Sequence, residues 1–253
     1  MNIANPTRLG FIYPLGGAEH EYYRFADDSG GTIRSYLVGA RIFGEGRDHD
    51  IFHLRRTASL ENLKDAAQGL VPLSCHAAIW ACTSGSFVDG RAHAEKQARA
   101  IAEITGCPAS STSLAFASAL ERLGVRKAAV VASYPEPAAR AFLGFLRDFG
   151  VDVPELVWLD APAGPDAARF GTERLVAAAR GLDLGKIDVV LVPDTAMPGL
   201  DLSRRLEAEL GIPALTANQV TIWEALRLAG YTMPPGKLDL LLDDGAPREL
   251  PGR

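Results

Sequence analysis

The segment 77–87 (AAIWACTSGSF) places a thiol beside small polar residues in a way that suits proton transfer. An apolar run ends at Cys82, and Thr83 and Ser84 follow directly. A thiol can donate or accept a proton, while hydroxyls and clustered backbone N–H groups can hold a carboxylate and stabilise the enediolate formed beside it. We therefore predict that Cys82 is an acid or base and that the next residues form an oxyanion pocket. A small, buried packing cysteine is the alternative.

Two further polar residues lie where predicted strands end. Tyr134 ends the predicted strand 127–134, and Asp194 follows the predicted strand 187–193. In parallel α/β sheets, ligands bind beyond the carboxyl ends of the strands. We expect Cys82, Tyr134 and Asp194 to surround one cleft, with the thiol and the carboxyl group on opposite sides of a bound carbon. The alternatives are a capping or turn role for Asp194 and a rim position for Tyr134, with its hydroxyl in water.

The three cysteines are expected to differ in reactivity. Backbone N–H donors near Cys82 should favour its thiolate, so we expect it to be alkylated before Cys75 and Cys107, which read as small apolar residues. An odd number of cysteines at irregular spacing forms no disulfide framework. A reducing cytoplasm is therefore the predicted location.

Two weaker signals complete the chemistry-bearing residues. The segment 15–21 (LGGAEHE) follows a strand without the spacing of a dinucleotide or phosphate loop, so we interpret it as a substrate-side loop. His49 and His53 lie four residues apart, as metal ligands on a helix would. Their segment reads as extended and has no further ligand nearby, so we expect a solvated pair and no metal site.

The pattern around these residues predicts an α/β fold. Short apolar strands alternate with amphipathic helices, and continuous apolar strands between helices are typical of parallel sheets covered on both faces. The predicted strands are 8–14, 77–82, 127–134 and 187–193, and the predicted helices are 91–106, 137–150, 202–211 and 221–230. The last residues, 234–253, carry less pattern, and we expect them to be partly mobile.

Two segments of the chain resemble each other. Residues 106–124 and 211–230 both begin Gly-X-Pro-Ala, continue with small hydroxyl or amide residues and end in a helix. The strand before the first segment ends at Cys82, and the strand before the second leads to Asp194. A duplicated unit would give these two residues equivalent places. Coincidence is the alternative, because Gly-X-Pro is a common stop signal after a helix.

Composition narrows the classes of function. The chain has 253 residues, is 47% hydrophobic and carries a formal net charge of -5. It therefore has no basic field for nucleic acid or anionic lipid, and no apolar stretch reaches the length of a membrane span. The first residues lack the layout of a secretory signal.

The motifs together resemble the aspartate/glutamate racemase superfamily and, within it, the branch of arylmalonate decarboxylases and maleate isomerases. The segment CTSGSF is similar to the first active-site segment of the decarboxylases, and MPGL (residues 197–200) is similar to a maleate isomerase motif. The resemblance implies two pseudo-symmetric Rossmann-like lobes, with the active site in the cleft between them and no cofactor or metal. The implied lobes are residues 1–112 with 216–253, and residues 113–215.

The resemblance also assigns roles to single residues. It places Thr83 and Ser84 in a dioxyanion pocket, with Tyr134 as the pocket tyrosine and Pro14 as the proline at the end of the first strand. Cys82 matches the cysteine of racemases and maleate isomerases, a position that is glycine in the decarboxylases.

The later motif departs from the family. Asp194 stands where the family usually has a second cysteine, and the loop after Pro14 lacks the asparagine of maleate isomerases. We count Thr195, the next residue along, among the substrate-binding residues. Both departures argue against a plain maleate isomerase and against a plain two-cysteine racemase.

The predicted function is decarboxylation of a malonate-type acid through an enediolate, with Cys82 as proton donor and Asp194 positioning substrate or acting as the opposite-face acid. A racemase or a cis–trans isomerase using Cys82 is the alternative reaction. A non-catalytic domain that binds a small acid is the alternative of another class. The expected partner is a small carboxylate, with no nucleic acid and no membrane, and a homo-oligomer is left open.

Overall fold

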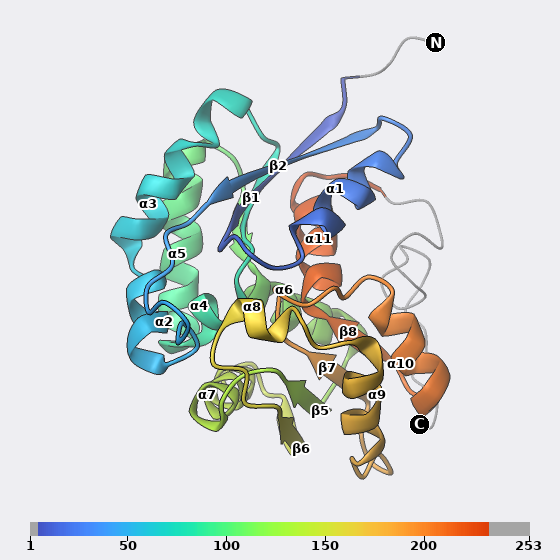
Figure 1. Ribbon diagram of the computed structural model, residues 1–253. Coiled ribbons are helices and arrows are strands. Elements are labelled where there is room, and N and C mark those ends of the chain that lie inside the picture. Colours follow the sequence, from blue (N-terminus) through green and yellow to red (C-terminus); the bar gives the residue numbers. More distant parts are fainter. Residues whose placement is uncertain (1–4, 233–253) are drawn as a thin grey trace.

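The computed structural model describes residues 5–232, whose strands form two parallel sheets (Figure 1). The strand order is β2-β1-β3-β4 in the first sheet and β6-β5-β7-β8 in the second. The strands are β1 (Thr7–Tyr13), β2 (Ile33–Gly39), β3 (Ala77–Trp80), β4 (Ala109–Ser111), β5 (Lys127–Ala132), β6 (Asp152–Trp158), β7 (Val189–Val192) and β8 (Ala214–Thr216). The predicted fold class, two α/β lobes with parallel sheets, is confirmed.

Helices connect the strands and cover the sheets. They are α1 (Glu19–Asp27), α2 (Ile51–Thr57), α3 (Leu60–Gln68), α4 (Thr83–Phe87), α5 (Gly90–Thr105), α6 (Thr112–Leu123), α7 (Glu136–Arg147), α8 (Gly164–Ala167), α9 (Thr172–Arg180), α10 (Leu202–Leu210) and α11 (Ala217–Leu228), with a short 3₁₀ turn at Val71–Leu73. Figure 1 shows α3 and α5 on one side of the first sheet, with α1 and α11 on the other. Among the described residues, no helix is both long enough and apolar enough to cross a membrane.

Strand β5 shows why its sequence is continuously apolar. Ala128, Val130 and Ala132 belong to the larger core cluster, whereas Ala129 and Val131 belong to the cluster under α9 and α10. Successive side chains of a strand point to opposite faces, so both faces of this strand are buried. Both the burial and the apolar run follow from the parallel arrangement.

The two similar segments of the sequence form the same substructure twice. Gly106 and Gly211 end α5 and α10 with the left-handed φ of 69° that glycine adopts without strain. Each is followed by a short strand and a helix, namely β4 and α6 in one case and β8 and α11 in the other. Strands β3 and β7 consequently hold the same place in their sheets, next to β4 and β8.

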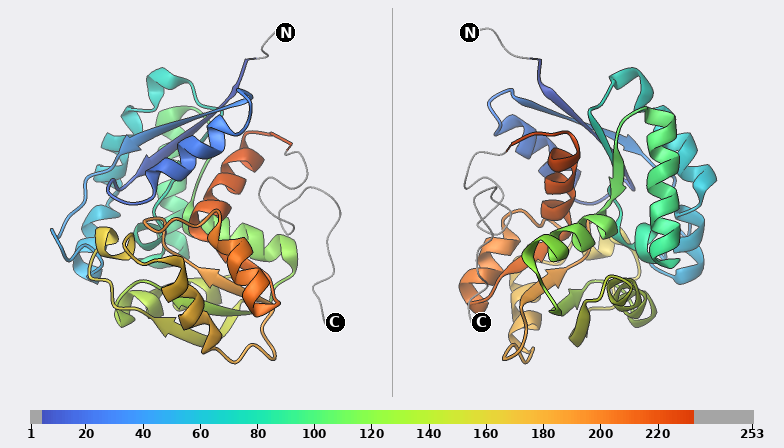
Figure 2. Two further views of the ribbon diagram at one scale, coloured as in Figure 1. Left: turned by 45° about the vertical axis from the view of Figure 1, so that its right-hand side comes forward. Right: turned by 180° about the vertical axis from the view of Figure 1, so that it is seen from behind.

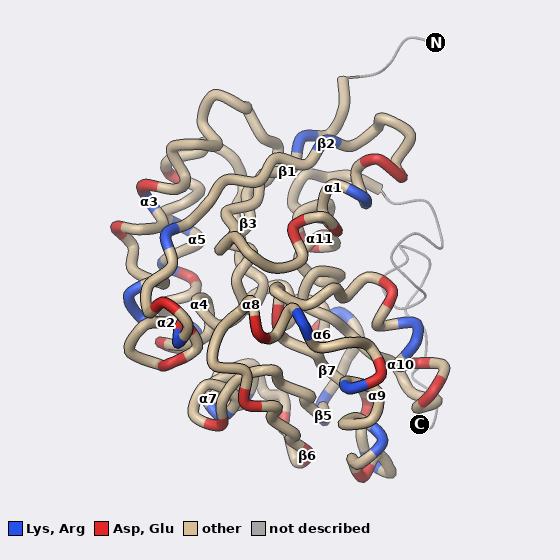
Figure 3. The backbone as a smooth tube through the Cα atoms, in the orientation of Figure 1, with Lys and Arg blue, Asp and Glu red and all other residues tan. Residues whose placement is uncertain are grey.

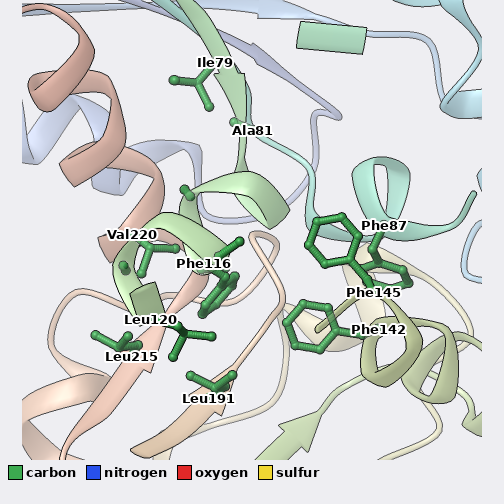
Figure 4. Packing of buried hydrophobic residues seen from close by; sticks show 14 of the residues in the cluster. Ile79, Ala81, Phe87, Phe116, Leu120, Phe142, Phe145, Leu191, Leu215 and Val220 are labelled. Carbon is green, nitrogen blue, oxygen red and sulfur yellow. The ribbon is translucent and has the colours of Figure 1, made fainter. Parts of the chain in front are cut away.

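The two lobes exchange their last helices. Helix α11 leaves β8 of the second sheet and packs on β1, β3 and β4 of the first. On α6, Phe116 and Leu120 share a core cluster with Leu191 and Leu215 of the second sheet (Figure 4). Figure 2 shows α11 and α6 crossing between the two sheets. We propose that the lobes are residues 1–112 with 216–253, and residues 113–215, because the exchange of helices supports these boundaries.

Several predicted elements differ from the observed ones. The predicted strands 77–82 and 127–134 end at Trp80 and Ala132, because the chain turns out of each sheet before Cys82 and Tyr134. The segment around His53, expected to be extended, is helix α2 with Asp50 at its N-cap. The predicted mobile tail lies outside the described residues.

Charged residues of both signs are interspersed over the outer helices (Figure 3).

Candidate active site

A pocket lies between the two lobes, beyond the carboxyl ends of β1, β3 and β7. The space inside it, counting its open mouth, is about 450 Å³. Its lining residues are Pro14, Leu15, Gly16, Gly17, Ile42, Asp48, His49, Leu54, Cys82, Ser84, Gly164, Pro165, Asp194, Thr195 and Ala196. The structure thus brings five of the seven predicted site residues to one pocket, and leaves Thr83 and Tyr134 outside its lining.

Cys82 is the N-cap of α4. Its sulfur accepts a hydrogen bond from the backbone N–H of Gly85 at 3.3 Å, and Ser84 Oγ lies 3.8 Å away. A side chain at position 85 would meet the Trp80 ring at 2.9 Å and Cys82 Sγ at 3.1 Å, so glycine allows this close approach.

The expectation of a Cys82 thiolate disagrees with its surroundings. Burial raises the pKa of the Cys82 thiol to about 12, and the hydrogen bonds from Gly85 and Ser84 offset only part of this effect. The side chain is 5% exposed. A thiol desolvated in this way stays protonated at neutral pH, which suits a proton donor better than a nucleophile.

The hydroxyls after Cys82 have different roles. Ser84 lines the pocket. Thr83 Oγ1 is buried beside the Tyr134 hydroxyl and makes no hydrogen bond of good geometry within the described residues, so it could still accept or donate one. Ser86, in contrast, is used internally, because its hydroxyl bonds to Cys82 O at 2.9 Å and to Ser113 Oγ at 2.7 Å. Ser86 therefore fixes α4 and is engaged within the protein, whereas Ser84 lines the pocket.

Tyr134 supports the pocket from outside its lining. Its side chain is 1% exposed, so the alternative of a rim tyrosine in water is wrong. Its hydroxyl donates to Pro193 O, and its ring packs edge-on against His49 with centroids 4.9 Å apart. The hydroxyl is thus engaged by the backbone next to Asp194, and it also interacts with the hydroxyls of Thr83 and Ser84.

Asp194 faces Cys82 from the second lobe. Its carboxyl group accepts hydrogen bonds from the Ser133 hydroxyl and from the backbone N–H of Ala196, the latter at 2.9 Å. Burial raises the pKa of Asp194, and the nearby imidazole of His49 opposes this rise only in part. Asp194 therefore stays protonated to a higher pH than an exposed aspartate does.

The loop after β1 forms the third side of the pocket, as expected of a substrate-side loop. Pro14 to Gly17 line it. Gly17 approaches the second lobe so closely that a side chain there would lie 2.6 Å from Ala196 Cα. Glu19 holds the loop by accepting the backbone N–H groups of Gly16 and Gly17, the latter at 3.0 Å.

Sequence reasoning missed Asp48 and His49. The interpretation of His49 as solvated is wrong, because it is 4% exposed and lines the pocket. Its Nδ1 lies 2.9 Å from Ala161 O, and Asp48 Oδ2 accepts the backbone N–H of Gly164 at 3.0 Å. The one sequence signal that could have indicated them as pocket residues is their place on a loop just before a helix.

The charge of the pocket comes from carboxyl groups and an imidazole. Asp48, His49 and Asp194 line it, and no lysine or arginine is among its described lining residues. A carboxylate bound there would rely on hydroxyl and thiol donors. Within residues 5–232, no group of three or more His, Cys, Asp or Glu side chains is arranged to hold a metal ion.

Comparisons with known proteins agree with this arrangement. The family model described as arylmalonate decarboxylase matches residues 56–240. Maleate isomerase of Geobacillus stearothermophilus is 26% identical over 159 residues, which make up 60% of this chain and 63% of that enzyme, less than two thirds of its length. Arylmalonate decarboxylase of Bordetella bronchiseptica is 29% identical over 176 residues, covering 68% of this chain and 73% of that enzyme.

A solved structure extends the likeness over the whole fold. It is a variant of the maleate cis-trans isomerase of Nocardia farcinica with a covalently bound succinylcysteine intermediate. The TM-score is 0.83 at 21% identity, and the alignment covers 96% of this chain and 100% of that chain. At this identity the likeness establishes the fold.

Proposed function

The chain belongs to the arylmalonate decarboxylase family, and from this premise we propose that it is an enzyme that decarboxylates a malonate-type acid without a cofactor. The observation that carries the proposal is the placement of Cys82 and Asp194 on one pocket, each after the equivalent strand of its lobe. A small carboxylate is the proposed substrate.

The protonation of these two groups favours decarboxylation over the alternatives. Losing CO2 leaves a carbanion, which needs a proton donor and no base. Racemisation needs one group to remove a proton and another to return it, and cysteine addition to a double bond needs a thiolate. Burial raises the pKa of both Cys82 and Asp194, so both lean towards their proton-carrying forms.

We assign the retained carboxylate of the substrate to the hydroxyl of Ser84, which lines the pocket, and to that of Thr83, which lies just outside the lining and would turn towards the ligand. The Thr83 hydroxyl is buried beside the Tyr134 hydroxyl without a hydrogen bond of good geometry, so a substrate carboxylate would give it a better partner. The leaving carboxylate would lie against apolar lining residues such as Leu54 and Pro14, where loss of its charge is favourable. Pro14 and Thr195 would shape the space around the α-carbon.

The proposed reaction replaces one carboxylate of the substrate with a proton. The bond from the α-carbon to the leaving carboxylate breaks, its electron pair enters the enediolate at Thr83 and Ser84, and CO2 departs. The S–H proton of Cys82 then forms the new C–H bond, and the thiolate regains a proton from solvent. Asp194, on the side of the pocket opposite Cys82, would donate a hydrogen bond to the substrate.

Cis–trans isomerisation or racemisation with Cys82 is the second candidate. The succinylcysteine in the Nocardia farcinica structure favours it, because a cysteine of that enzyme bonds covalently to a four-carbon diacid. In the present pocket the high pKa of Cys82 would have to fall when substrate binds.

Proton NMR in D2O tests the proposal with a panel of substituted malonates, maleate and amino acids. We expect loss of CO2 with one deuteron on the α-carbon of the product. Cys82→Ala should lower turnover about 100-fold or more. Cys107→Ala is the matched control, since Cys107 lies outside the pocket lining. Isomerisation of maleate or α-proton exchange without CO2 loss would contradict the proposal.

A cytoplasmic location remains a prediction from the cysteines.

A further inference from the structure

We propose that Glu21 is a positioning residue that holds the segment carrying Asp194 against the first lobe. Glu21 lies on α1, after β1 of the first sheet, and its side chain is 2% exposed. The segment it holds connects β7 to α10 in the second sheet. That Asp194 takes part in the reaction rests on the proposed function, whereas the anchoring itself does not.

The carboxylate of Glu21 accepts three hydrogen bonds. The backbone N–H of Gly199 donates to Oε2 at 2.7 Å, and that of Leu200 donates to Oε1 at 2.9 Å. Asn218 Nδ2 on α11 donates to Oε2 at 2.8 Å. Both oxygens are thus bound to the segment that follows Asp194.

Tyr13 and Asn218 fix the same segment nearer to Asp194. Tyr13 at the end of β1 donates its hydroxyl to Thr195 O at 2.7 Å. Asn218 Nδ2 also lies 3.0 Å from Met197 O. Glu21 therefore orients Asn218 as well as binding the backbone directly, so the place of Asp194 relative to the first lobe depends on this glutamate.

The charge of Glu21 suits this anchoring. Two backbone N–H groups and an amide N–H all point at the carboxylate, which has acceptors only when ionised. The nearest cation, Arg24, lies 3.7 Å away and is 43% exposed, and it also pairs with Asp201 at 2.8 Å. Glutamine would have the same shape, but its NH2 group would face one of the N–H donors and break that hydrogen bond.

A pH titration of Asp194 tests the anchoring without substrate. The full chain is labelled with [γ-13C]aspartate, the carboxyl signal of Asp194 is assigned by its loss in Asp194→Asn, and its titration is followed by 13C NMR. In Glu21→Gln we expect the signal to titrate at lower pH than in the parent, because a released segment admits water to Asp194.

Glu224→Gln is the matched control. Glu224 is also 2% exposed and is held by Arg227 at 2.7 and 2.9 Å, away from the Asp194 segment. A shift in Glu21→Gln with none in Glu224→Gln supports the proposal. Equal titration of Asp194 in the parent and in folded Glu21→Gln overturns it.

Asn218→Ala keeps the test decisive if Glu21→Gln does not fold. It removes the bonds to Glu21 and to Met197 O, so we expect a shift in the same direction, and an unchanged Asp194 signal overturns the proposal. In the decarboxylation assay Glu21→Gln should lower kcat about 10- to 100-fold, with little added loss in an Asp194→Asn background. A parent inactive on every substrate would overturn the proposed function alone.

Discussion

The backbone N–H of Gly85 donates to Cys82 Sγ at 3.3 Å, so the sulfur acts as the N-cap acceptor of α4 and its own proton stays free to be donated. This relationship explains how one cysteine can both start a helix and serve a pocket. It also ties the position of the thiol to the backbone of α4, and not to a flexible side-chain contact.

Alkylation of Cys82 should be slow near neutral pH and accelerate as the pH rises. Burial raises the pKa of its thiol to about 12, and only the thiolate reacts. Iodoacetamide labelling followed by peptide mass spectrometry should first detect Cys107, which is less buried, with activity retained. Fast labelling of Cys82 at pH 7 would contradict the buried thiol and favour the isomerase alternative.

Thr83→Val should separate catalysis from stability. The Thr83 hydroxyl is buried without a hydrogen bond of good geometry, so removing it should leave the Tm unchanged or raise it. Transition-state stabilisation, measured from kcat/KM, should fall by about 2 to 4 kcal/mol, as for other oxyanion donors.

Thr112→Val is the opposite control for that variant. The Thr112 hydroxyl is bonded to Thr221 at 2.7 Å, outside the pocket lining, so its loss should lower the Tm and spare kcat/KM. An unchanged kcat/KM in Thr83→Val would mean that Thr83 only fills space.

Activity should depend on protonated Asp194. Burial raises its pKa, so the acid form persists above the usual range and is lost as the pH rises through that raised value. We expect kcat of the parent to fall on the alkaline side. Asp194→Asn should keep KM, lower kcat and lack this decline in a pH–rate profile. A decline that persists in the variant would assign it to another group.

The same shift predicts the pH dependence of stability. A carboxyl group whose pKa is raised on folding binds its proton more tightly in the folded state, so stability falls as the pH rises from the unfolded pKa through the folded one. Asp194→Asn should therefore gain in Tm relative to the parent across this window and show no gain below it. Thermal unfolding at a series of pH values measures the difference, and a constant offset would contradict the shift.

Asp194→Cys should introduce a second thiol on the opposite side of the pocket. This restores the two-cysteine arrangement, so we expect it to create or increase α-proton exchange on racemase-type substrates. Deuterium incorporation into amino acids in D2O measures the effect, with Cys82→Ala/Asp194→Cys as the control that should abolish it. No exchange in the single variant would indicate that residue 194 does not reach the α-carbon.

The sequence alone predicted several elements of this protein, among them β1, β3, β5 and β7, and the two positions that its duplicated pattern marks. Apolar runs between helices predict buried parallel strands, and a strand that ends in polar residues places those residues at the ligand-binding edge of a sheet. Cys82 and Asp194 were found in this way. These signals are local, because the period of side chains along a strand or helix is written in neighbouring residues.

Only the tertiary structure decided which polar groups face the pocket and in what state. Ser86 donates to Ser113 inside the protein, and His49 is buried. Glu21 accepts hydrogen bonds from Gly199 and Leu200, which lie 178 and 179 residues away in the chain. The local pattern around Cys82 predicted a thiolate, whereas burial raises the pKa of its thiol. Hydrogen-bond partners and desolvation depend on residues brought together by folding, so no spacing in the chain records them.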